Sequence, residues 1–404
     1  MNYSDTIEYL FSRLPMYQRK GIAAYKKNIG NIIKACKYLK NPHKKFKSIH
    51  IAGTNGKGST SHIIASIIQE AGYNCGLYTS PHLKDFKERI RYNGKKISKN
   101  DVVDFVERNK NNFEMLNMSF FEYTVAMAFD FFQKKKVDIA IIETGLGGRL
   151  DSTNIILPEV SVITNISMDH SNLLGDSLKK IAIEKAGIIK PNTPVVIGKK
   201  QDSINTIFQK IAKNLNSNIY YATELNNNTN LYNMKNAPDY HIENIKTAIA
   251  TIKILNWNID NEHIQNGIRN VNKNTDLKGR WQKLSNKPLT ICDTAHNEEG
   301  IKNICDEIKK IKFDKLHFIL GTVNDKNLDN ILCLLPKNAK YYFCKPNIER
   351  GLNASLLKQE AIKHGLKGED FQSTKLAFRI ANKNAKPNDM IFIGGSNFIV
   401  AEII

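Results

Sequence analysis

The sequence has no two cysteines at the spacing of a C-x-x-C motif. Its six cysteines are scattered, at Cys36, Cys75, Cys292, Cys305, Cys333 and Cys344. This spacing favours free thiols over a disulfide framework or a zinc site. The chain also lacks a basic segment followed by an apolar segment at its start, and it has no apolar run of membrane-spanning length. We therefore expect a cytoplasmic protein with no membrane partner.

Acidic residues are few compared with basic ones. The chain has 39 Asp and Glu against 59 Lys and Arg, which gives a formal net charge of +20 at pH 7. A charge of this size suggests nucleic-acid binding. The lysines are nevertheless dispersed among asparagine and isoleucine, and a short run such as residues 134–136 fits the solvated last turn of a helix. We expect no nucleic-acid partner, and instead a positive field that attracts anionic substrates.

The chain length predicts two domains, because 404 residues exceed what one hydrophobic core usually serves. Short β-branched runs that alternate with helical repeats predict an α/β fold. We expect an N-terminal P-loop ATPase-like domain with a mostly parallel sheet, followed by a smaller C-terminal Rossmann-like α/β domain. A polar segment with a proline, residues 284–288, is interpreted as the linker, so the predicted domains are 1–284 and 285–404.

The most informative stretch is residues 48–68, SIHIAGTNGKGSTSHIIASII, which predicts a strand, a glycine-rich loop and a helix. Three glycines let the backbone curl with its N–H groups pointing inward, Lys57 adds a positive charge, and two hydroxyl residues follow. These residues are Gly53, Gly56, Gly58, Ser59 and Thr60. Such a loop cradles a triphosphate and its magnesium. The match to G-x-x-x-x-G-K-[ST] is imperfect, because Gly58 stands where Ser or Thr is usual.

Polar residues follow other predicted strands. Ser80 comes just after one strand, Glu143 ends the strongly apolar strand 137–142, and His170 lies shortly beyond another. Ligands gather at the carboxyl ends of the strands in an open parallel sheet. A strand-end acid beside a phosphate-loop hydroxyl is also how P-loop enzymes hold magnesium. The structural alternatives are a simple turn at Ser80-Pro81 and an ordinary core or surface role for His170.

The C-terminal part repeats strand and helix at short spacing, which favours a second parallel sheet. Its strands are expected near residues 289–293, 316–320, 340–344 and 389–394. The first of these ends in Asp293 and is followed by His296. Because strand-end loops collect ligands, we expect this domain to face the first across a cleft.

Four blocks occur in a fixed order along the chain. They are IAGTNGKGS at 51–59, TSPHL at 79–83, ETGLGGRLDSTN at 143–154 and EKAGI at 184–188. Together they resemble folylpolyglutamate synthase and bifunctional dihydrofolate synthase, which belong to the Mur ligase superfamily of ATP-dependent amide-bond ligases. The resemblance runs from residue 9 to the C-terminus. It implies a monomer that uses ATP and magnesium to join L-glutamate to dihydropteroate, to folate polyglutamates, or to both.

The family's chemistry implies a role for each matching residue. A pterin-bearing carboxylate attacks the γ-phosphate of ATP, and the amine of glutamate then attacks the acyl phosphate. The resemblance implies nucleotide binding by Gly53, Thr54, Asn55, Gly56, Lys57, Gly58, Ser59, Asn244, Arg280 and Asp293. It implies magnesium ligands at Ser59, Ser80, Glu143, His170 and Lys185. The family carbamylates the lysine in the last of these positions, which would orient a second magnesium ion.

Other matches concern catalysis and the acceptor substrate. The resemblance implies catalytic roles for Lys57, His170, Lys185 and His296. Phe121 and Asp151 resemble parts of the pterin-side pocket, and for Phe121 a core role is an open alternative. The family has a D-G-A-H-N block around the position of His296, and this chain has Thr294 in place of its glycine.

Two other functions were weighed against this one. A peptidoglycan-type Mur ligase shares the architecture but would carry a nucleotide-sugar domain before the phosphate loop, where this chain has only about fifty residues. A nucleic-acid-dependent ATPase would need basic residues on one face or aromatic platforms for bases, and the sequence shows neither. The choice between dihydropteroate and folate polyglutamate stays open, because it depends on the shape of the pterin pocket.

Overall fold

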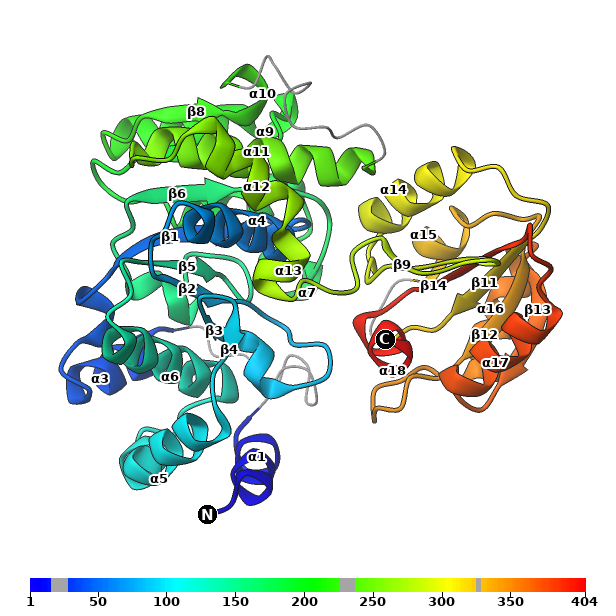
Figure 1. The fold of residues 1–404 in the computed structure, drawn as a ribbon, viewed down its shortest axis with the longest axis horizontal. Coiled ribbons are helices and arrows are strands. Elements are labelled where there is room, and N and C mark those ends of the chain that lie inside the picture. Colours follow the sequence, from blue (N-terminus) through cyan, green and yellow to red (C-terminus); the bar gives the residue numbers. More distant parts are fainter. Residues whose placement is uncertain (16–27, 226–236, 325–327) are drawn as a thin grey trace. The chain divides into compact units, whose positions relative to one another are not determined.

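The computed structural model describes residues 1–15, 28–225, 237–324 and 328–404. The chain divides into two compact α/β units, residues 1–277 and 278–404 (Figure 1). The α/β fold with a large, mostly parallel sheet and a second, smaller sheet is confirmed. The asparagine-rich segment 226–236, for which the sequence predicts an exposed loop, lies outside the described residues.

The first unit is built on an eight-stranded sheet with the order β4-β3-β2-β5-β1-β6-β7-β8. Its strands are β1 (Lys47–Ala52), β2 (Cys75–Tyr78), β3 (Ile90–Tyr92), β4 (Lys95–Lys96), β5 (Ile139–Glu143), β6 (Val160–Ile163), β7 (Val195–Ile197) and β8 (Ile219–Tyr221). All neighbours from β2 to β8 pair in parallel. The hairpin β3–β4 turns at Asn93-Gly94, where both residues have positive φ, as the sequence predicts.

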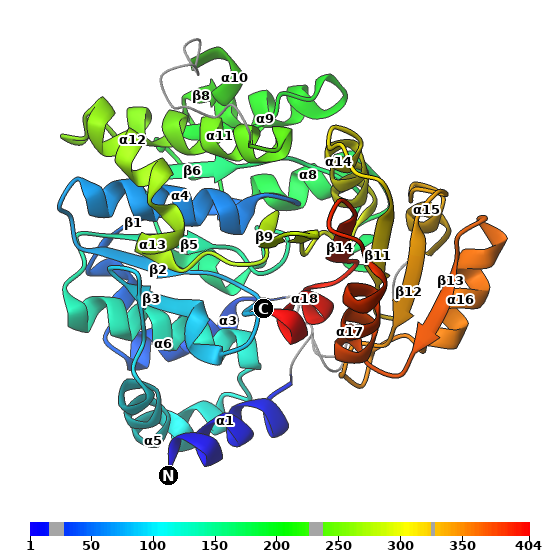
Figure 2. The ribbon, with the colours of Figure 1, turned by 45° about the vertical axis from the view of Figure 1, so that its right-hand side comes forward.

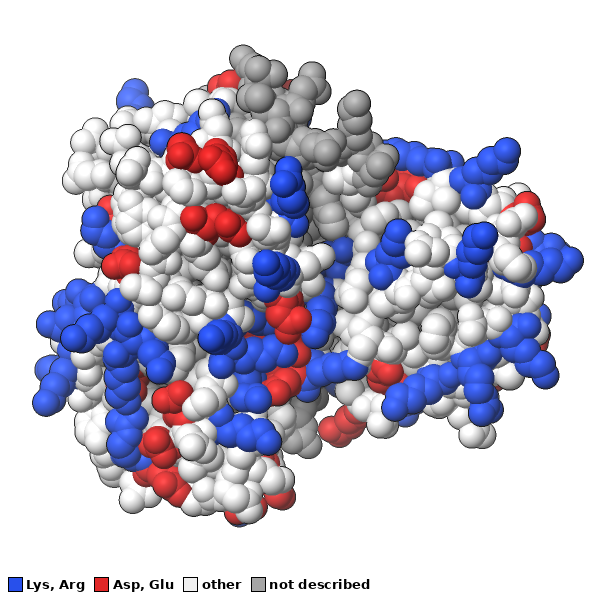
Figure 3. Space-filling view, in the orientation of Figure 1, with Lys and Arg blue, Asp and Glu red and all other residues white. Residues whose placement is uncertain are grey.

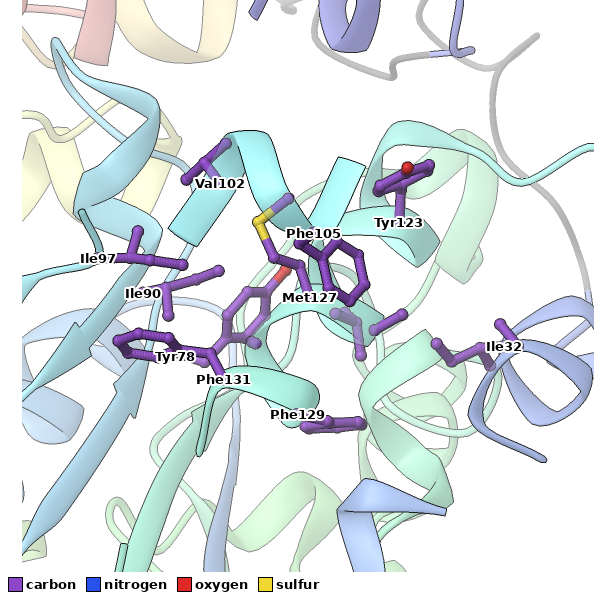
Figure 4. Packing of buried hydrophobic residues seen from close by; sticks show 14 of the residues in the cluster. Ile32, Tyr78, Ile90, Ile97, Val102, Phe105, Tyr123, Met127, Phe129 and Phe131 are labelled. Carbon is purple, nitrogen blue, oxygen red and sulfur yellow. The ribbon is translucent and has the colours of Figure 1, made fainter. Parts of the chain in front are cut away.

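Helices cover both faces of this sheet because its strands alternate apolar residues between two cores. In β5, Ala140 and Ile142 pack with the aromatic residues of α6 (Phe120–Lys135), whereas Ile139 and Ile141 pack with α4 (Lys57–Glu70). Figure 4 shows part of the first core. The other helices are α1 (Tyr3–Ser12), α3 (Gly30–Tyr38), η2 (Pro42–Lys44), η3 (Phe86–Arg89), α5 (Lys99–Met115), η4 (Ser152–Ile155), α7 (Ser171–Leu174), α8 (Leu178–Ala186), α9 (Asp202–Asn214), α10 (Ala222–Leu225), α11 (Asp239–Leu255), α12 (Asn261–Arg269) and α13 (Val271–Thr275).

The second unit contains a six-stranded sheet with the order β13-β12-β11-β14-β10-β9. Its strands are β9 (Gln282–Asn286), β10 (Leu289–Cys292), β11 (Leu316–Leu320), β12 (Lys340–Cys344), β13 (Lys367–Phe371) and β14 (Met390–Gly394). Its helices are α14 (Glu298–Lys309), α15 (Leu328–Leu332), α16 (Ala354–Lys363), α17 (Thr374–Asn384) and α18 (Asn397–Ile403). One face of the sheet packs against α17 and α18 (Figure 2).

The linker prediction at residues 284–288 is wrong. Leu284 and Ser285 lie in β9, which pairs antiparallel with β10 and places Ser285 opposite Thr290. The second unit therefore begins at Lys278, and the boundary expected after residue 284 falls inside a strand. The strand was missed because it is polar and sits at the sheet edge, so the sequence shows no alternation of apolar and polar residues.

Charge and cysteine usage agree with the sequence-based expectations. On the face in Figure 3, Lys and Arg side chains are spread over both units with Asp and Glu among them. All six cysteines are free, and only Cys333 is exposed. Within the described ranges, none of the helices combines the length and apolar character needed to cross a membrane.

Candidate functional site

The glycine-rich loop leaves β1 in a conformation that requires two of its glycines. Gly53 has a φ of +145° and Gly56 a φ of +81°. A Cβ atom at Gly53 would lie 1.9 Å from Thr164 Oγ1, and one at Gly56 would lie 2.0 Å from Asn244 Oδ1. Both positions therefore exclude a side chain, and Asn244 of α11 lies directly against the loop.

Hydrogen bonds tie the loop to the segment that follows β6. The Thr54 N–H donates to the carbonyl of Asn165 at 2.8 Å, and the Asn55 N–H donates to Asn165 Oδ1 at 2.9 Å. Thr164 Oγ1 donates to the carbonyl of Asn55 at 2.6 Å. The predictions for this loop did not include Thr164 or Asn165, because nothing in the local sequence pattern reveals a partner more than 100 residues away.

The helix after the loop begins without a side-chain cap. Gly56 is the N-cap of α4, and none of the described side chains caps the helix. The first N–H groups of a helix have no intrahelical partner, and the helix dipole adds partial positive charge there. The start of α4 is therefore suited to bind a phosphate group. Lys57 and Ser59 both lie in this first turn.

Two lysine ammonium groups converge on the loop. Lys57 Nζ donates to the carbonyls of Gly53 and Thr54 at 3.0 and 3.1 Å, and Lys185 Nζ donates to the same Gly53 carbonyl at 2.8 Å. Burial lowers the pKa of Lys185 to about 7, and the positive charge of Lys57 adds to that effect. The lysine that the sequence placed in a separate block thus lies at the phosphate loop.

An acid lies near the first turn of α4. Glu143 ends β5 opposite Ile51 of β1, is buried, and accepts the Ser80 N–H at 3.0 Å. A Cβ atom at Gly58 would be 3.7 Å from the Glu143 carboxylate, which is an ordinary contact. The neighbouring Thr60 hydroxyl is buried and has no hydrogen-bond partner in the described part of the chain. The structure therefore brings Ser80 and Glu143 to the loop, as expected.

His170 is more exposed than the other residues of this group. It has a φ of +51°, its N–H donates to Asp169 Oδ1 at 2.9 Å, and its Nε2 is 3.8 Å from Asp169 Oδ2. Its side chain is 30% exposed. Among the residues that the structure describes, no three His, Cys, Asp or Glu side chains are grouped to hold a metal. A metal ion at the loop would therefore need hydroxyl and ligand oxygens besides the Glu143 carboxylate.

The two residues expected to bind the acceptor differ in their surroundings. Phe121, at the start of α6, is partly buried, and its ring lies where a Cβ atom at Gly145 would be, 2.4 Å from Cζ. Asp151 is buried, and its carboxylate accepts from Gly145, Leu146 and Thr153. This carboxylate is engaged by its own loop, and the substrate contact that we expect for Asp151 stays a prediction.

The second unit holds its predicted residues in one corner. Asp293, just after β10, accepts the Trp281 N–H at 2.6 Å through Oδ2 and the Ala295 N–H at 2.8 Å through Oδ1. Arg280 and His296 are the chain neighbours of these two donors. The His296 Nδ1 is 3.0 Å from the Thr294 carbonyl. Thr294 is absent from the positive-φ residues of the described chain, so a side chain there strains no backbone.

The loop geometry predicts that Gly56→Ala lowers both stability and nucleotide affinity. The variant combines a positive φ with a collision against Asn244, whereas Gly72→Ala has a similar φ of +83° and no atom within 4 Å. Gly72→Ala should lose about 1 to 2 kcal/mol of unfolding free energy in urea titrations, the cost of the backbone conformation alone. Gly56→Ala should lose more and bind ATP more weakly by calorimetry. Equal losses in the two variants would contradict the predicted collision.

Family comparisons agree with this geometry. Residues 51–265 match the Mur ligase middle domain, and residues 279–397 match the Mur ligase glutamate ligase domain. The chain is 31% identical to "Dihydrofolate synthase/folylpolyglutamate synthase" of Bacillus subtilis, over 99% of the chain and 98% of that protein. The chain is 28% identical to "Probable bifunctional folylpolyglutamate synthase/dihydropteroate synthase" of Haloferax volcanii. That match covers 100% of this chain but only 50% of the relative.

Solved structures show the same fold. A bifunctional folylpolyglutamate synthase/dihydrofolate synthase with Mn, AMPPNP and L-glutamate bound superposes with a TM-score of 0.84 at 26% identity, covering 100% of this chain and 97% of the other. The E. coli FolC structure in complex with DHPP and ADP gives a TM-score of 0.84 at 25% identity, with the same coverage. Both similarities extend over both units of this chain.

Proposed function

The chain belongs to the dihydrofolate synthase/folylpolyglutamate synthase family of Mur ligases, and from this premise we propose that it joins L-glutamate to a pterin-linked carboxylate at the expense of ATP. The observation that carries the proposal is the loop at the end of β1, where the uncapped start of α4, Lys57, Lys185 and the buried Glu143 meet. Two lysines and a carboxylate at one loop suit a magnesium–triphosphate.

The residues present fit a nucleotide and a divalent ion. The free N–H groups of α4 and the Lys57 ammonium favour phosphate oxygens, while Glu143, Ser80, Ser59 and the unpartnered Thr60 hydroxyl offer oxygen atoms. A bound Mg²⁺ would neutralise charge that develops on the phosphate oxygens. His170 is proposed as a further ligand. A related structure with Mn and AMPPNP bound supports a nucleotide and a divalent ion as ligands.

The fixed charges of the loop suit phosphoryl transfer to a carboxylate. As the acceptor carboxylate attacks the γ-phosphate, charge spreads over the phosphate oxygens, and Lys57 and the N–H groups of α4 stabilise it. ADP leaves, and the product is an acyl phosphate. The glutamate amine attacks its carbonyl carbon, phosphate leaves, and the nitrogen loses a proton to give the amide. For Asn244, Arg280 and Asp293 we propose nucleotide contacts, for Phe121 an acceptor contact, and for His296 a catalytic role.

Lys185 is proposed to act as a carbamate. Its pKa of about 7 leaves a substantial neutral fraction of the amine near neutral pH. A neutral amine adds to CO₂ and releases one proton, so the ammonium that now competes with Lys57 for the Gly53 carbonyl becomes an anion. That anion would hold a second magnesium ion.

The proposal is tested by ATP-dependent phosphate release with magnesium and L-glutamate, comparing dihydropteroate with tetrahydrofolate as acceptor and identifying products by mass. Phosphate release with dihydropteroate alone would assign a dihydrofolate synthase, with tetrahydrofolate alone a folylpolyglutamate synthase, and with both acceptors the bifunctional enzyme. We expect a cytoplasmic monomer whose turnover DNA does not stimulate. Absence of a glutamylated product with either acceptor would contradict the proposal.

A further inference from the structure

A buried chain of hydrogen bonds runs from the middle of β1 to the loop that follows β5. His50 Nε2 is 2.8 Å from Thr153 Oγ1, and Thr153 Oγ1 donates to Asp151 Oδ1 at 2.5 Å. The threonine hydroxyl has one proton, and it donates this proton in the hydrogen bond to the Asp151 carboxylate. His50 must therefore donate its Nε2–H to the hydroxyl oxygen.

His50 is an unusual residue for this position. It lies between Ile49 and Ile51 in a central strand and is fully buried, and burial lowers its pKa to about 3. It is therefore neutral, and its Nδ1 has no hydrogen-bond partner among the described residues. A buried unpaired nitrogen costs free energy that an apolar side chain would not. The contact with Thr153 is the structural reason for a histidine at this position.

The other oxygen of Asp151 holds the first half of the loop. Asp151 Oδ2 accepts the N–H groups of Gly145 and Leu146 at 2.9 and 2.8 Å. The ring of Phe121 packs on Gly145, since a Cβ atom there would lie 2.4 Å from Phe121 Cζ. The position of this ring thus depends on how Asp151 holds the loop.

The second half of the same loop is attached to the end of α8. The Arg149 N–H donates to the Glu184 carbonyl at 2.8 Å, and the Arg149 Nη2 donates to Glu184 Oε1 at 2.8 Å. Gly148 packs against the backbone of Lys185, because a Cβ atom there would lie 2.8 Å from the Lys185 carbonyl oxygen. The loop therefore touches Phe121 at one end and the backbone of Lys185 at the other.

We propose that His50 and Thr153 are positioning residues for the ligation reaction. By fixing Asp151 they hold residues 145–149 in one conformation. This loop then positions the Phe121 ring on the acceptor side relative to the Lys185 side chain on the phosphate side. The inference rests on the proposed function for the roles of Phe121 and Lys185. The hydrogen-bond chain itself is independent of that function.

Thr153→Val tests the inference, because valine keeps the shape of threonine and removes the hydroxyl. We expect a rise of about tenfold in the KM for the acceptor and a fall of similar size in kcat, since a misplaced reactant loses part of its alignment. The KM for glutamate should change little. Hydrogen exchange should become faster at the amides of Gly145 and Leu146 and at residues 184–187.

Two controls separate positioning from general loss of stability. Thr153→Ser keeps the hydroxyl and should restore the acceptor KM. Thr251→Val removes an equally buried hydroxyl, in α11, that donates only to the Thr247 carbonyl at 2.8 Å. It should lose comparable stability without a change in acceptor KM. Identical kinetics in the two valine variants, or failure of the serine to restore KM, would overturn the proposal.

A second pair of variants tests the His50 end of the hydrogen-bond chain. His50→Gln places an amide N–H near the position of Nε2 and should retain the slow exchange at Gly145 and Leu146, whereas His50→Leu should lose it. If the wild-type protein makes no glutamylated product, the proposed function fails, and hydrogen exchange still decides whether the chain holds the loop. If the wild type is active and His50→Leu keeps both the slow exchange and the acceptor KM, the positioning proposal fails alone.

Discussion

Lys57→Ala is expected to reduce ATP-dependent phosphate release by on the order of 10³-fold, the loss typical of removing one preorganised charge from a site where negative charge develops. Lys57 Nζ lies at the mouth of the loop, within hydrogen-bond distance of the Gly53 and Thr54 carbonyls, and is free to exchange those neutral acceptors for phosphate oxygens. The measurement is steady-state phosphate release at saturating acceptor and glutamate.

The control is Lys45→Ala. Lys45 is an exposed lysine of the same unit whose side chain makes no ion pair or hydrogen bond with the residues that the structure describes, so its loss removes the same charge at a surface position. It should leave turnover within twofold of wild type. Because Lys57 also holds two loop carbonyls, thermal unfolding of both variants should be compared. If Lys57→Ala turned over at a rate close to that of Lys45→Ala, the result would contradict the assignment of this loop as the phosphate-binding loop.

The parallel framework was predictable from the sequence because its signals are local. The predicted strand 137–142 is apolar apart from Asp138, so its burial and its terminal acid follow from the pattern. The structure forms it as Ile139–Glu143 and places Glu143 beside Gly58. The Asn93-Gly94 turn is equally local. The loop glycines were identified from spacing alone, although the atoms that exclude side chains from Gly53 and Gly56 belong to Thr164 and Asn244.

The remaining features depend on partners distant in sequence. Strands β9 and β13 are polar edge strands, so only their pairing with β10 and β12 reveals them. The low pKa of Lys185 likewise arises from burial and from Lys57, more than 100 positions earlier. The metal ligands stay a prediction.

Lys185→Met should lower turnover by on the order of 10²-fold or more, because the substitution keeps the length of the side chain but cannot form a carbamate. Short carboxylates added to Lys185→Ala, where a cavity remains, should restore part of the activity. Full activity of either variant without additive would contradict the carbamate. The matched control is Lys190→Met, since Lys190 is a partly buried lysine of the same region that donates to the Asn154 carbonyl.

Lys185→Met, which should lower turnover, should raise the stability of the nucleotide-free protein in CO₂-free buffer. The pKa of Lys185 is about 7 in the folded protein, whereas an ordinary lysine, as in the unfolded chain, has a pKa of 10.5. Between pH 7 and pH 10.5 the unfolded chain therefore binds more protons than the folded protein. The contribution of this site to stability is therefore lowest below pH 7 and rises as the pH increases toward 10.5. Lys185→Met should be more stable than wild type at pH 6, and the difference should shrink by pH 9. A difference independent of pH would show that Lys185 stays protonated at the loop, and a protonated amine cannot add CO₂.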